Sequence, residues 1–221
     1  DTRHYLNGVF LHLTEAHGRN FLTGVATDSH RLSSSSVEIE NTNNFSSLIL
    51  PRKAVYQLCS LLSESNEKFS MQTSENKVKF NLGSIKLISK VIDGKFPDYK
   101  KVVPNDNKKF LVVPSKDFIN SIERVASVSL DRKEGVKLSI NKENIQLSVN
   151  SVSSGEGNEI IKADFNSDNF NISFNSKYLI DIISEVEDRN LKMNLKDSVS
   201  PVLIEDASDK NSYYVIMPMK I

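Results

Sequence analysis

The 221-residue chain has a single cysteine, so no disulfide can close within it, as is typical of proteins from a reducing cytoplasm. It also lacks any run that approaches the roughly 18 apolar residues needed to cross a membrane. Neither sign of charge is in excess, because Lys and Arg number 28 and Asp and Glu number 28. These features exclude a protein held on nucleic acid or membrane by bulk charge alone, and they predict a cytoplasmic globular protein.

Residues that would mark a metal or cofactor site are also scarce. The eight glycines form no glycine-rich phosphate-binding loop. The histidines show no HxH or HExxH spacing, which favours scattered surface and strand positions over metal ligation: His4, His12, His17 and His30. We therefore expect no cofactor and no bound metal.

Asp28, Ser29 and His30 are the residue types of a hydrolase triad, but they are consecutive. Neighbouring residues of a strand point to opposite faces, so three in a row cannot converge on one reacting atom. The segment is better interpreted as a strand end or turn, either simply solvated or displaying His30 and Arg31. We predict no catalytic residue. A metal-dependent nuclease using Asp28 and His30 is kept as an alternative, although no carboxylate cluster for two metal ions is apparent.

Alternation of apolar and polar residues dominates the chain and predicts strands, whereas three stretches show the helical period. Strands are predicted over 5–16, 20–28, 34–41, 69–74, 77–83, 85–94, 135–143, 144–151, 157–165, 190–197, 200–206 and 213–221. Helices are predicted over 51–65, 114–129 and 175–188. Within the helices, Cys59 falls on an apolar stripe and is expected in the core, and Ser115 is the expected N-cap.

The two halves of the chain repeat one pattern. Residues 48–74 and 172–197 each run strand, helix, strand, which indicates a duplication with a period of about 125 residues. The stretch 96–110 is rich in Pro, Lys and Asn and is the best linker candidate, so we place domains at 1–107 and 108–221. The helix at 114–129 has no partner in the first copy, and we expect its counterpart upstream of Asp1. Each repeat predicts an α+β unit in which helices cover one face of an antiparallel sheet.

Two basic residues occupy the first turn of a predicted helix, where positive charge is unfavourable. Arg52 and Lys53 lie in the first turn of the helix at 51–65, where positive charge opposes the helix dipole. A phosphate group bound at that turn is one explanation, and a solvated basic face is the other.

The C-terminus is unusually apolar, reading YYVIMPMKI over 213–221. Pro218 removes a ladder donor, so this strand must lie at a sheet edge or leave the sheet there. Met217 and Met219 are flexible and suit surfaces that fit several partners. The segment is either a groove for apolar peptides or a last strand that closes its own core.

Taken together, these segments resemble the β subunit of bacterial DNA polymerase III, the sliding-clamp family. The resemblance spans the chain in the family's order and rests on YLNGV, ATDSHRL, LPRKAV, DGKFPDYKKVVP, FNSKYLIDII, DSVSPVLIEDAS and YYVIMPMKI. It implies the α+β DNA-clamp fold, with repeated antiparallel sheets each covered on one face by helices. In this family three similar domains form a protomer, and two protomers close head to tail into a ring around duplex DNA. The chain resembles the middle domain without its first strand and helix, followed by the whole C-terminal domain.

The resemblance implies a non-catalytic processivity factor of DNA replication, which docks polymerase subunits, the clamp loader and repair proteins through short linear motifs. The docking site is implied as a hydrophobic cleft between the two domains. Carried over by motif, its residues are Leu6, Thr27, Ser29, His30, Arg31, Leu32, Pro97, Lys101, Val102, Asn175, Tyr178, Val199, Pro201, Val215, Ile216, Met217, Pro218, Met219, Lys220 and Ile221. Leu6, Leu32, Val102, Val215 and Ile216 are expected to form the apolar floor. Ser29 replaces a frequent glycine of the family, Pro201 a frequent serine, and Lys101 and Lys220 frequent arginines.

Two further surfaces follow from the resemblance. The residues implied to face DNA are Arg3, His4, Tyr5, Arg52 and Lys53, and those implied at the ring interface are Ser127 and Val128. A ring that holds DNA by topology needs only a mildly basic lining, which agrees with zero net charge. The full-length protein is expected to be a ring-shaped homodimer, and the present chain alone is expected to form no closed ring. A stand-alone peptide-binding module is the remaining alternative.

Overall fold

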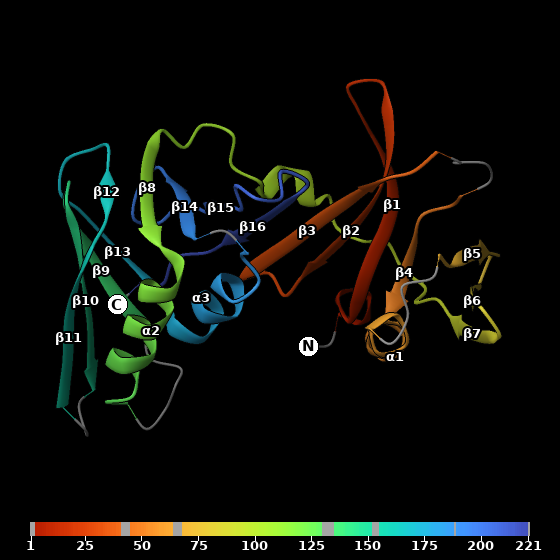
Figure 1. The fold of residues 1–221 in the computed structure, drawn as a ribbon, viewed down its shortest axis with the longest axis horizontal. Helices are drawn as coiled ribbons and strands as arrows, with labels where there is room; N and C mark the ends of the chain where they lie inside the picture. Colours follow the sequence, from red (N-terminus) through yellow and green to blue (C-terminus); the bar gives the residue numbers. More distant parts are fainter. Residues whose placement is uncertain are drawn as a thin grey trace. The chain divides into compact units, whose positions relative to one another are not determined.

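The computed structural model describes residues 3–40, 45–63, 68–129, 135–151, 155–187 and 189–220. The described residues fall into two compact units, which are considered separately (Figure 1). Unit 1 comprises Asp1–Asp28 and Ser34–Asp98, and unit 2 comprises Ser29–Ser33 and Tyr99–Ile221.

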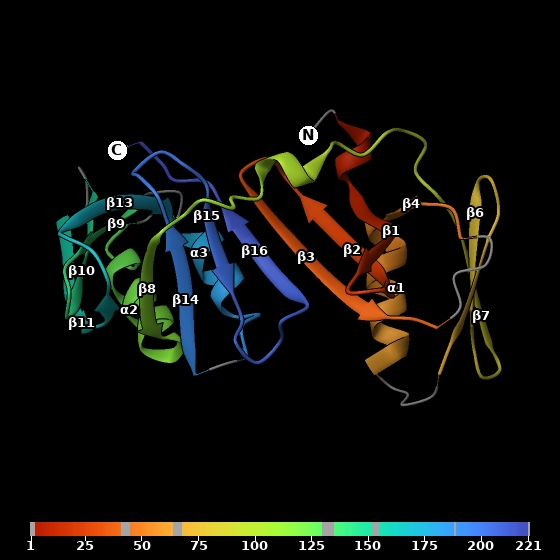
Figure 2. The ribbon, with the colours of Figure 1, turned by 90° about the horizontal axis from the view of Figure 1, so that it is seen from above.

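Unit 1 contains the 3-10 turn η1 (His4–Leu6), β1 (Gly8–Ala16), β2 (Arg19–Thr27), most of β3 (Arg31–Glu38), β4 (Leu48–Pro51), α1 (Arg52–Ser63), β5 (Ser70–Thr73), β6 (Lys77–Leu82) and β7 (Ile85–Lys90). The strands are ordered β3-β2-β1-β4 in one sheet and β5-β6-β7 in another. Helix α1 packs on β1 and β4 (Figure 2). Its half-buried face, which includes Leu58 and Leu62, covers a core that contains Leu50 and Phe80.

Unit 2 contains η2 (Tyr99–Val102), β8 (Lys109–Pro114), α2 (Ser115–Ala126), β9 (Gly135–Ile140), β10 (Asn144–Ser151), β11 (Gly155–Lys162), β12 (Asp164–Phe165), β13 (Phe170–Asn175), α3 (Ser176–Ile183), β14 (Asn190–Leu195), β15 (Val202–Glu205) and β16 (Ser212–Ile216). The strands are ordered β11-β10-β9-β13 in one sheet and β12-β8-β14-β15-β16 in the other. Helices α2 and α3 pack on each other (Figure 1) and contribute Phe118, Ile122 and Leu179 to one continuous core. Burial alternates along β10, as its alternating sequence predicts.

The predicted internal repeat is confirmed by the strand pairing. In unit 1, β1 pairs with β2 and β4, and β6 pairs with β5 and β7. In unit 2, β9 pairs in the same way with β10 and β13, and β15 with β14 and β16. Helix α1 follows β4 just as α3 follows β13. The segment β8–α2 has no equivalent among the described elements of unit 1.

The hairpin between β1 and β2 shows how local sequence fixes register. His17 and Gly18 form the turn with positive φ angles of 52° and 71°, and Ala16 pairs directly with Arg19. Two consecutive residues with positive φ match the twist of the flanking strands, and glycine takes this conformation without strain. The turn therefore sets the pairing that continues to Phe10 opposite Val25.

Several element ends differ from the sequence predictions. The predicted strand 5–16 begins only at Gly8, because His4–Leu6 form η1. Ser115 is not the N-cap of α2: Pro114 has the extended cap geometry, and Ser115 is the first helical residue. Helix α3 ends at Ile183, well before the predicted end at 188, a residue that lies outside the described ranges.

Cys59 was expected in the core, and this prediction is wrong, because its side chain is exposed. The apolar stripe of α1 is centred on Ala54, Leu58 and Leu62, which are buried or half-buried. Cys59 follows Leu58 by one residue, about 100° further round the helix, and so lies beyond the edge of the stripe. None of the helices in the described ranges is both long and apolar enough to cross a bilayer.

Gly157 in β11 permits a close approach of α2. A Cβ atom at this position would lie 2.5 Å from Cγ2 of Val128 and 2.9 Å from the carbonyl oxygen of Val125. We expect Gly157→Ala to lower the free energy of unfolding of unit 2 by about 1–3 kcal/mol, because the backbone of α2 must shift. Urea denaturation measures this. Gly24→Ala is the control, since a Cβ there meets side chains at an ordinary 3.4 Å; equal effects of the two substitutions would contradict the close approach.

Candidate functional site

The turn before β3 presents the first residues of the candidate site. Ser29 has a φ angle of 77°, a conformation that glycine adopts most easily. This agrees with the expectation, drawn from the resemblance, that glycine would suit the position. His30, exposed at the surface, accepts a hydrogen bond at its carbonyl oxygen from the backbone N–H of Met217 over 2.8 Å. Within unit 2, the turn at Ser29 and His30 is thereby joined to the C-terminal segment.

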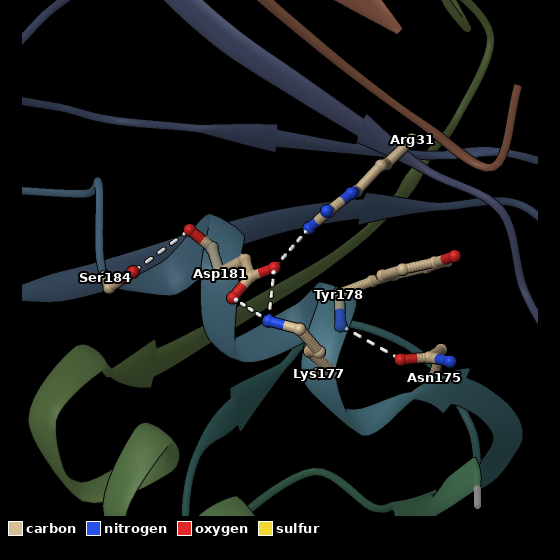
Figure 3. Close-up of polar contacts among 6 residues, drawn as sticks. All are labelled: Arg31, Asn175, Lys177, Tyr178, Asp181 and Ser184. Atoms are coloured by element: carbon tan, nitrogen blue, oxygen red, sulfur yellow. Dashed lines mark hydrogen bonds and ion pairs between the residues drawn. The ribbon is translucent and has the colours of Figure 1, made fainter. Parts of the chain in front are cut away.

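Arg31 is held against α3 by contacts of two kinds (Figure 3). Its Nη1 donates to Oδ2 of Asp181 over 2.7 Å. Its guanidinium carbon lies 4.4 Å from the centroid of the Tyr178 ring, which is cation–π range. The ring of His30 lies 6.2 Å from the same tyrosine ring, at an interplanar angle of 27°. His30 of the turn and Arg31, the first residue of β3, therefore both contact α3.

Asn175 fixes the start of α3 and so the position of Tyr178. Its Oδ1 accepts the backbone N–H of Tyr178 over 3.0 Å, the standard N-cap bond (Figure 3). We call His30, Arg31, Asn175, Tyr178 and Met217 the candidate docking surface of unit 2, whose docking role is proposed below. All five were predicted from the family resemblance, and the structure brings them together within one unit.

Asp181 carries the negative charge that matches Arg31. Its carboxylate also accepts from Nζ of Lys177, at 3.1 Å and 3.2 Å for its two oxygens. Burial acts to raise the pKa of Asp181, but the hydrogen bonds from Arg31 and then Lys177 outweigh it, and the pKa lies below its ordinary value. The carboxylate is therefore ionised at neutral pH and pairs with both cations.

The C-terminal segment closes the core of unit 2, as one of the two interpretations of the sequence expected. Strand β16 ends at Ile216, whose side chain is buried in the core of unit 2. Residues 217–220 leave the strand, as the missing donor of Pro218 predicts, and the N–H of Met219 donates to the Ser173 carbonyl over 2.7 Å. Met217 is 37% exposed. The segment thus closes its own core through β16 and presents methionine at the surface beyond it.

The predicted cleft residues belong to both units. Leu6, Thr27 and Pro97 are in unit 1, and the other described members are in unit 2. Ile221 lies outside the described residues. Leu32, Val215 and Ile216 are at most 3% exposed, so they support the surface from beneath and do not form an open floor. Among the described members in unit 2, exposed apolar side chains belong to Val102, Val199 and Met217.

A loop of unit 2 holds Val199 and Pro201 in place. Asp197 accepts hydrogen bonds from the backbone N–H groups of Val199 and Ser200 at 2.9 Å and 2.6 Å. The Ser200 hydroxyl, followed by these N–H groups, lowers the pKa of Asp197. Nδ2 of Asn107 donates to the carbonyl oxygens of Asn194 and Pro201, at 2.8 Å and 3.0 Å. The exposed side chain of Val199 is therefore carried by an ordered turn.

The residues predicted to face DNA all belong to unit 1: Arg3, His4, Tyr5, Arg52 and Lys53. The backbone N–H of Arg52 donates to the Asn7 carbonyl over 3.1 Å, and Gly8 pairs with Pro51. These contacts bring Asn7 and Gly8, which follow η1, to the first turn of α1. Tyr5 is half-buried and the other four residues are exposed. The first turn of α1 has no acidic residue, so the helix dipole and two cations concentrate positive potential at this end.

Ser127 and Val128, predicted at the ring interface, follow α2. Ser127 is the exposed C-cap, and Val128 is half-buried. Nearby, Arg124 pairs with Glu159 of β11, with Nε 3.0 Å from Oε2, so the charge of Arg124 is matched within unit 2. Ser127 also lines a groove of about 560 Å³ between the helices, together with Glu123, Ala126, Ser176, Lys177, Ile180 and Asp181.

Asp28 and His30, the residues of the nuclease alternative, lie on either side of Ser29 in the turn before β3. Among the described residues, no group of three or more His, Cys, Asp or Glu side chains is arranged to hold a metal ion. Asp181 was missed by the sequence predictions. Its spacing of four from Lys177 was visible on a helix, but its pairing with Arg31 joins residues 150 positions apart.

Known proteins resemble this chain over its whole length. The model of the DNA polymerase III beta subunit central domain matches residues 1–98, and that of the C-terminal domain matches residues 100–220. The beta sliding clamp of Caulobacter vibrioides strain NA1000 is 35% identical over 222 residues, which cover 100% of this chain and 60% of the relative. That of Escherichia coli K12 is 34% identical, with 100% and 59% covered. The chain thus spans about 60% of the length of these relatives.

Solved structures agree with the sequence relatives. A Bartonella birtlesii sliding clamp bound to griselimycin has a TM-score of 0.96 at 38% identity, covering 100% of this chain and 60% of that one. A Caulobacter crescentus beta sliding clamp has a TM-score of 0.97 at 35% identity, with 100% and 59% covered. The predicted α+β clamp fold is confirmed by these likenesses. Because the two domain models follow each other along the whole chain, the protein belongs to the DNA polymerase III beta subunit family.

Proposed function

We propose that the chain is part of a cytoplasmic DNA sliding clamp, a non-catalytic subunit that makes the replicative polymerase processive. The observation that carries the proposal is the match of two consecutive clamp domains to residues 1–98 and 100–220. In this proposal the full-length protein forms a ring-shaped homodimer around duplex DNA, and Ser127 and Val128 lie at the junction of its protomers. We also propose that the boundary between the two domains lies between residues 107 and 108. The two family models meet a few residues earlier, at 98 and 100.

A primer-extension assay tests this proposal. When the protein at its natural length is added with its clamp loader, the polymerase is expected to synthesise longer DNA products each time it binds a primer. Incubation of the protein with magnesium and DNA, without polymerase, tests the nuclease alternative. DNA cleavage that is abolished by Asp28→Ala or His30→Ala would favour that alternative. Products of unchanged length would contradict the processivity role.

The docking surface of unit 2 is proposed to bind short apolar motifs of partner proteins, such as polymerase subunits, the clamp loader and repair proteins. Support comes from the exposed side chain of Met217 beside His30, Arg31 and Tyr178, which together offer apolar, aromatic and cationic contacts. Flexible methionine adapts to different ligands, which suits partners that take turns on one surface. A peptide-binding module without a DNA role would show this binding but no gain in processivity.

The basic end of α1 is proposed to contact the DNA backbone. We expect the double substitution Arg52→Gln and Lys53→Gln to reduce the salt dependence of duplex binding, because removing one phosphate-binding cation lowers the slope of log K against log salt by about 0.9. Fluorescence anisotropy of a short labelled duplex at several salt concentrations measures the slope. The control is Lys86→Gln with Lys90→Gln on β7, which removes the same charge elsewhere in unit 1. Identical slopes for the two double variants would contradict the assignment.

A further inference from the structure

We propose that Asp181 is a positioning residue of the docking surface: it holds the Arg31 guanidinium over the Tyr178 ring and thereby sets the affinity for partner peptides. The inference rests on the proposed docking function of unit 2. It assigns a role to a residue that lies outside the set carried over from the family resemblance.

The Arg31 guanidinium is contacted by two side chains of α3, those of Asp181 and Tyr178 (Figure 3). The Asp181 carboxylate contacts the guanidinium through Nη1 at 2.7 Å, and the Tyr178 ring lies 4.4 Å from the guanidinium carbon. The side chain of Arg31 is 29% exposed and that of Asp181 is 36% exposed. An ion pair and a ring contact together restrict a planar guanidinium more than either does alone.

Lys177 shares the same carboxylate but is the weaker partner. Its side chain is 62% exposed, and its Nζ contacts lie at 3.1 Å and 3.2 Å, longer than the contact from Arg31. A lysine four residues before an acidic residue is also the less favourable order on a helix. The main consequence of removing the Asp181 carboxylate is therefore expected at Arg31.

The position of Arg31 matters because this residue lies next to the C-terminal segment. His30, its neighbour, accepts the N–H of Met217, so Arg31 lies beside the C-terminal segment that presents methionine. A long side chain held in its binding geometry loses less rotamer freedom when a ligand docks. A side chain released from Asp181 has to be ordered during binding, which weakens affinity without removing any atom that touches the ligand.

The test is isothermal titration of the 221-residue chain with a synthetic apolar pentapeptide that has Gln near its start and Leu or Phe near its end. We expect Asp181→Asn to weaken binding about tenfold and Asp181→Glu to restore part of the loss. Lys177→Met is expected to leave affinity unchanged or slightly tighter, because Asp181 then serves Arg31 alone. Asp106→Asn is the matched control, since it breaks the Lys196 ion pair elsewhere in unit 2 with the same change of charge.

A double-mutant cycle shows whether Asp181 acts through Arg31. In an Arg31→Met background, Asp181→Asn is expected to have no further effect on peptide affinity. The NMR resonance of the Arg31 Nε–Hε group can be recorded without any peptide. Asp181→Asn is expected to shift this resonance toward that of a solvated arginine. Thermal unfolding of each variant separates these effects from loss of fold.

The outcomes distinguish the inference from the docking function beneath it. If the wild-type chain binds no peptide, the docking proposal fails and takes the inference with it. If the wild type binds and Asp181→Asn binds equally well, or weakens binding by the same factor without Arg31, the inference alone is overturned. A tenfold loss that depends on Arg31, with the control unchanged, supports it.

Discussion

A chain that ends at Ile216 is expected to lose detectable binding of short apolar peptides, a fall of at least about 100-fold in affinity. Burial of about 300–400 Å² of apolar ligand surface gives roughly 8–10 kcal/mol gross, and association costs reduce this to a micromolar affinity. Met217 and Met219 are expected to supply much of the adaptable contact. Without them the remaining surface falls below the affinity that calorimetry detects.

The shortened chain is expected to stay folded. Deletion of residues 217–221 removes the hydrogen bonds from Met217 to His30 and from Met219 to Ser173, each contributing about 1 kcal/mol. The core of unit 2 is complete through Ile216. Circular dichroism checks the fold, and isothermal titration with the same pentapeptide measures binding.

Point variants keep the backbone bonds and test the side chains alone. Met217→Ala with Met219→Ala is expected to weaken binding about 10- to 30-fold, a loss of up to about 2 kcal/mol. Ile88→Ala on β7 is the control, because its side chain is 62% exposed and belongs to unit 1. Equal affinities of the full and shortened chains would mean that the C-terminus only closes its own core.

Asp206→Ala is expected to lower the free energy of unfolding of unit 2 by about 2–3 kcal/mol. Asp206 is only 4% exposed, and its carboxylate accepts from the N–H of Glu187 at 2.9 Å and from the N–H and hydroxyl of Ser208 at 2.8 Å and 2.6 Å. It therefore ties the chain after α3 to the loop between β15 and β16. Removing the acceptor leaves these donors without their charged partner.

The stability given by Asp206 is also expected to depend on pH. Burial acts to raise its pKa, but the Ser208 hydroxyl and the N–H groups of Glu187 and Ser208 outweigh it and lower the pKa below its ordinary value. A depressed pKa in the folded state means that the stabilisation is complete above about pH 4 and disappears as pH falls through the folded pKa. In the Asp206→Ala variant, the free energy of unfolding should therefore fall less steeply as the pH is lowered below about 4.

Urea denaturation between about pH 2 and pH 7 measures both effects. Asp168→Ala, at an exposed position, serves as the control for loss of a carboxylate. Asp206→Asn retains one oxygen acceptor and is expected to show an intermediate loss of stability. A variant as stable as the wild type at pH 7 would contradict the structural role of Asp206.

The repeat was readable from the sequence because strand alternation and helix period are local signals. Residues 48–74 and 172–197 repeat their pattern of apolar residues, and the pairing of β4 with β1 and of β13 with β9 follows it. Boundaries were harder, because a 3-10 turn such as His4–Leu6 leaves the same apolar pattern as a strand end. Cys59 was misplaced because a helix stripe read by spacing alone is uncertain by one position.

The candidate site was readable only in part. Segments such as ATDSHRL identified Arg31 and its neighbours through the family resemblance, and Asn175 and Tyr178 likewise. The pairing of Arg31 with Asp181 spans 150 residues and depends on how the start of β3 packs on α3, which no local pattern encodes. Burial of Leu32, Val215 and Ile216 was also hidden, since an apolar residue at a surface and one beneath it look the same in sequence.

We propose that the full-length protein holds DNA by encircling it, and retention on DNA of different topology tests this directly. The natural full-length protein is loaded by its clamp loader onto nicked circular plasmid, and the bound fraction is followed by gel filtration before and after a single restriction cut. A protein that encircles DNA is expected to stay on the closed circle at moderate salt and to dissociate within minutes once the plasmid is linear. Equal retention on circular and linear DNA would contradict it, because the protein would then be held by contacts alone.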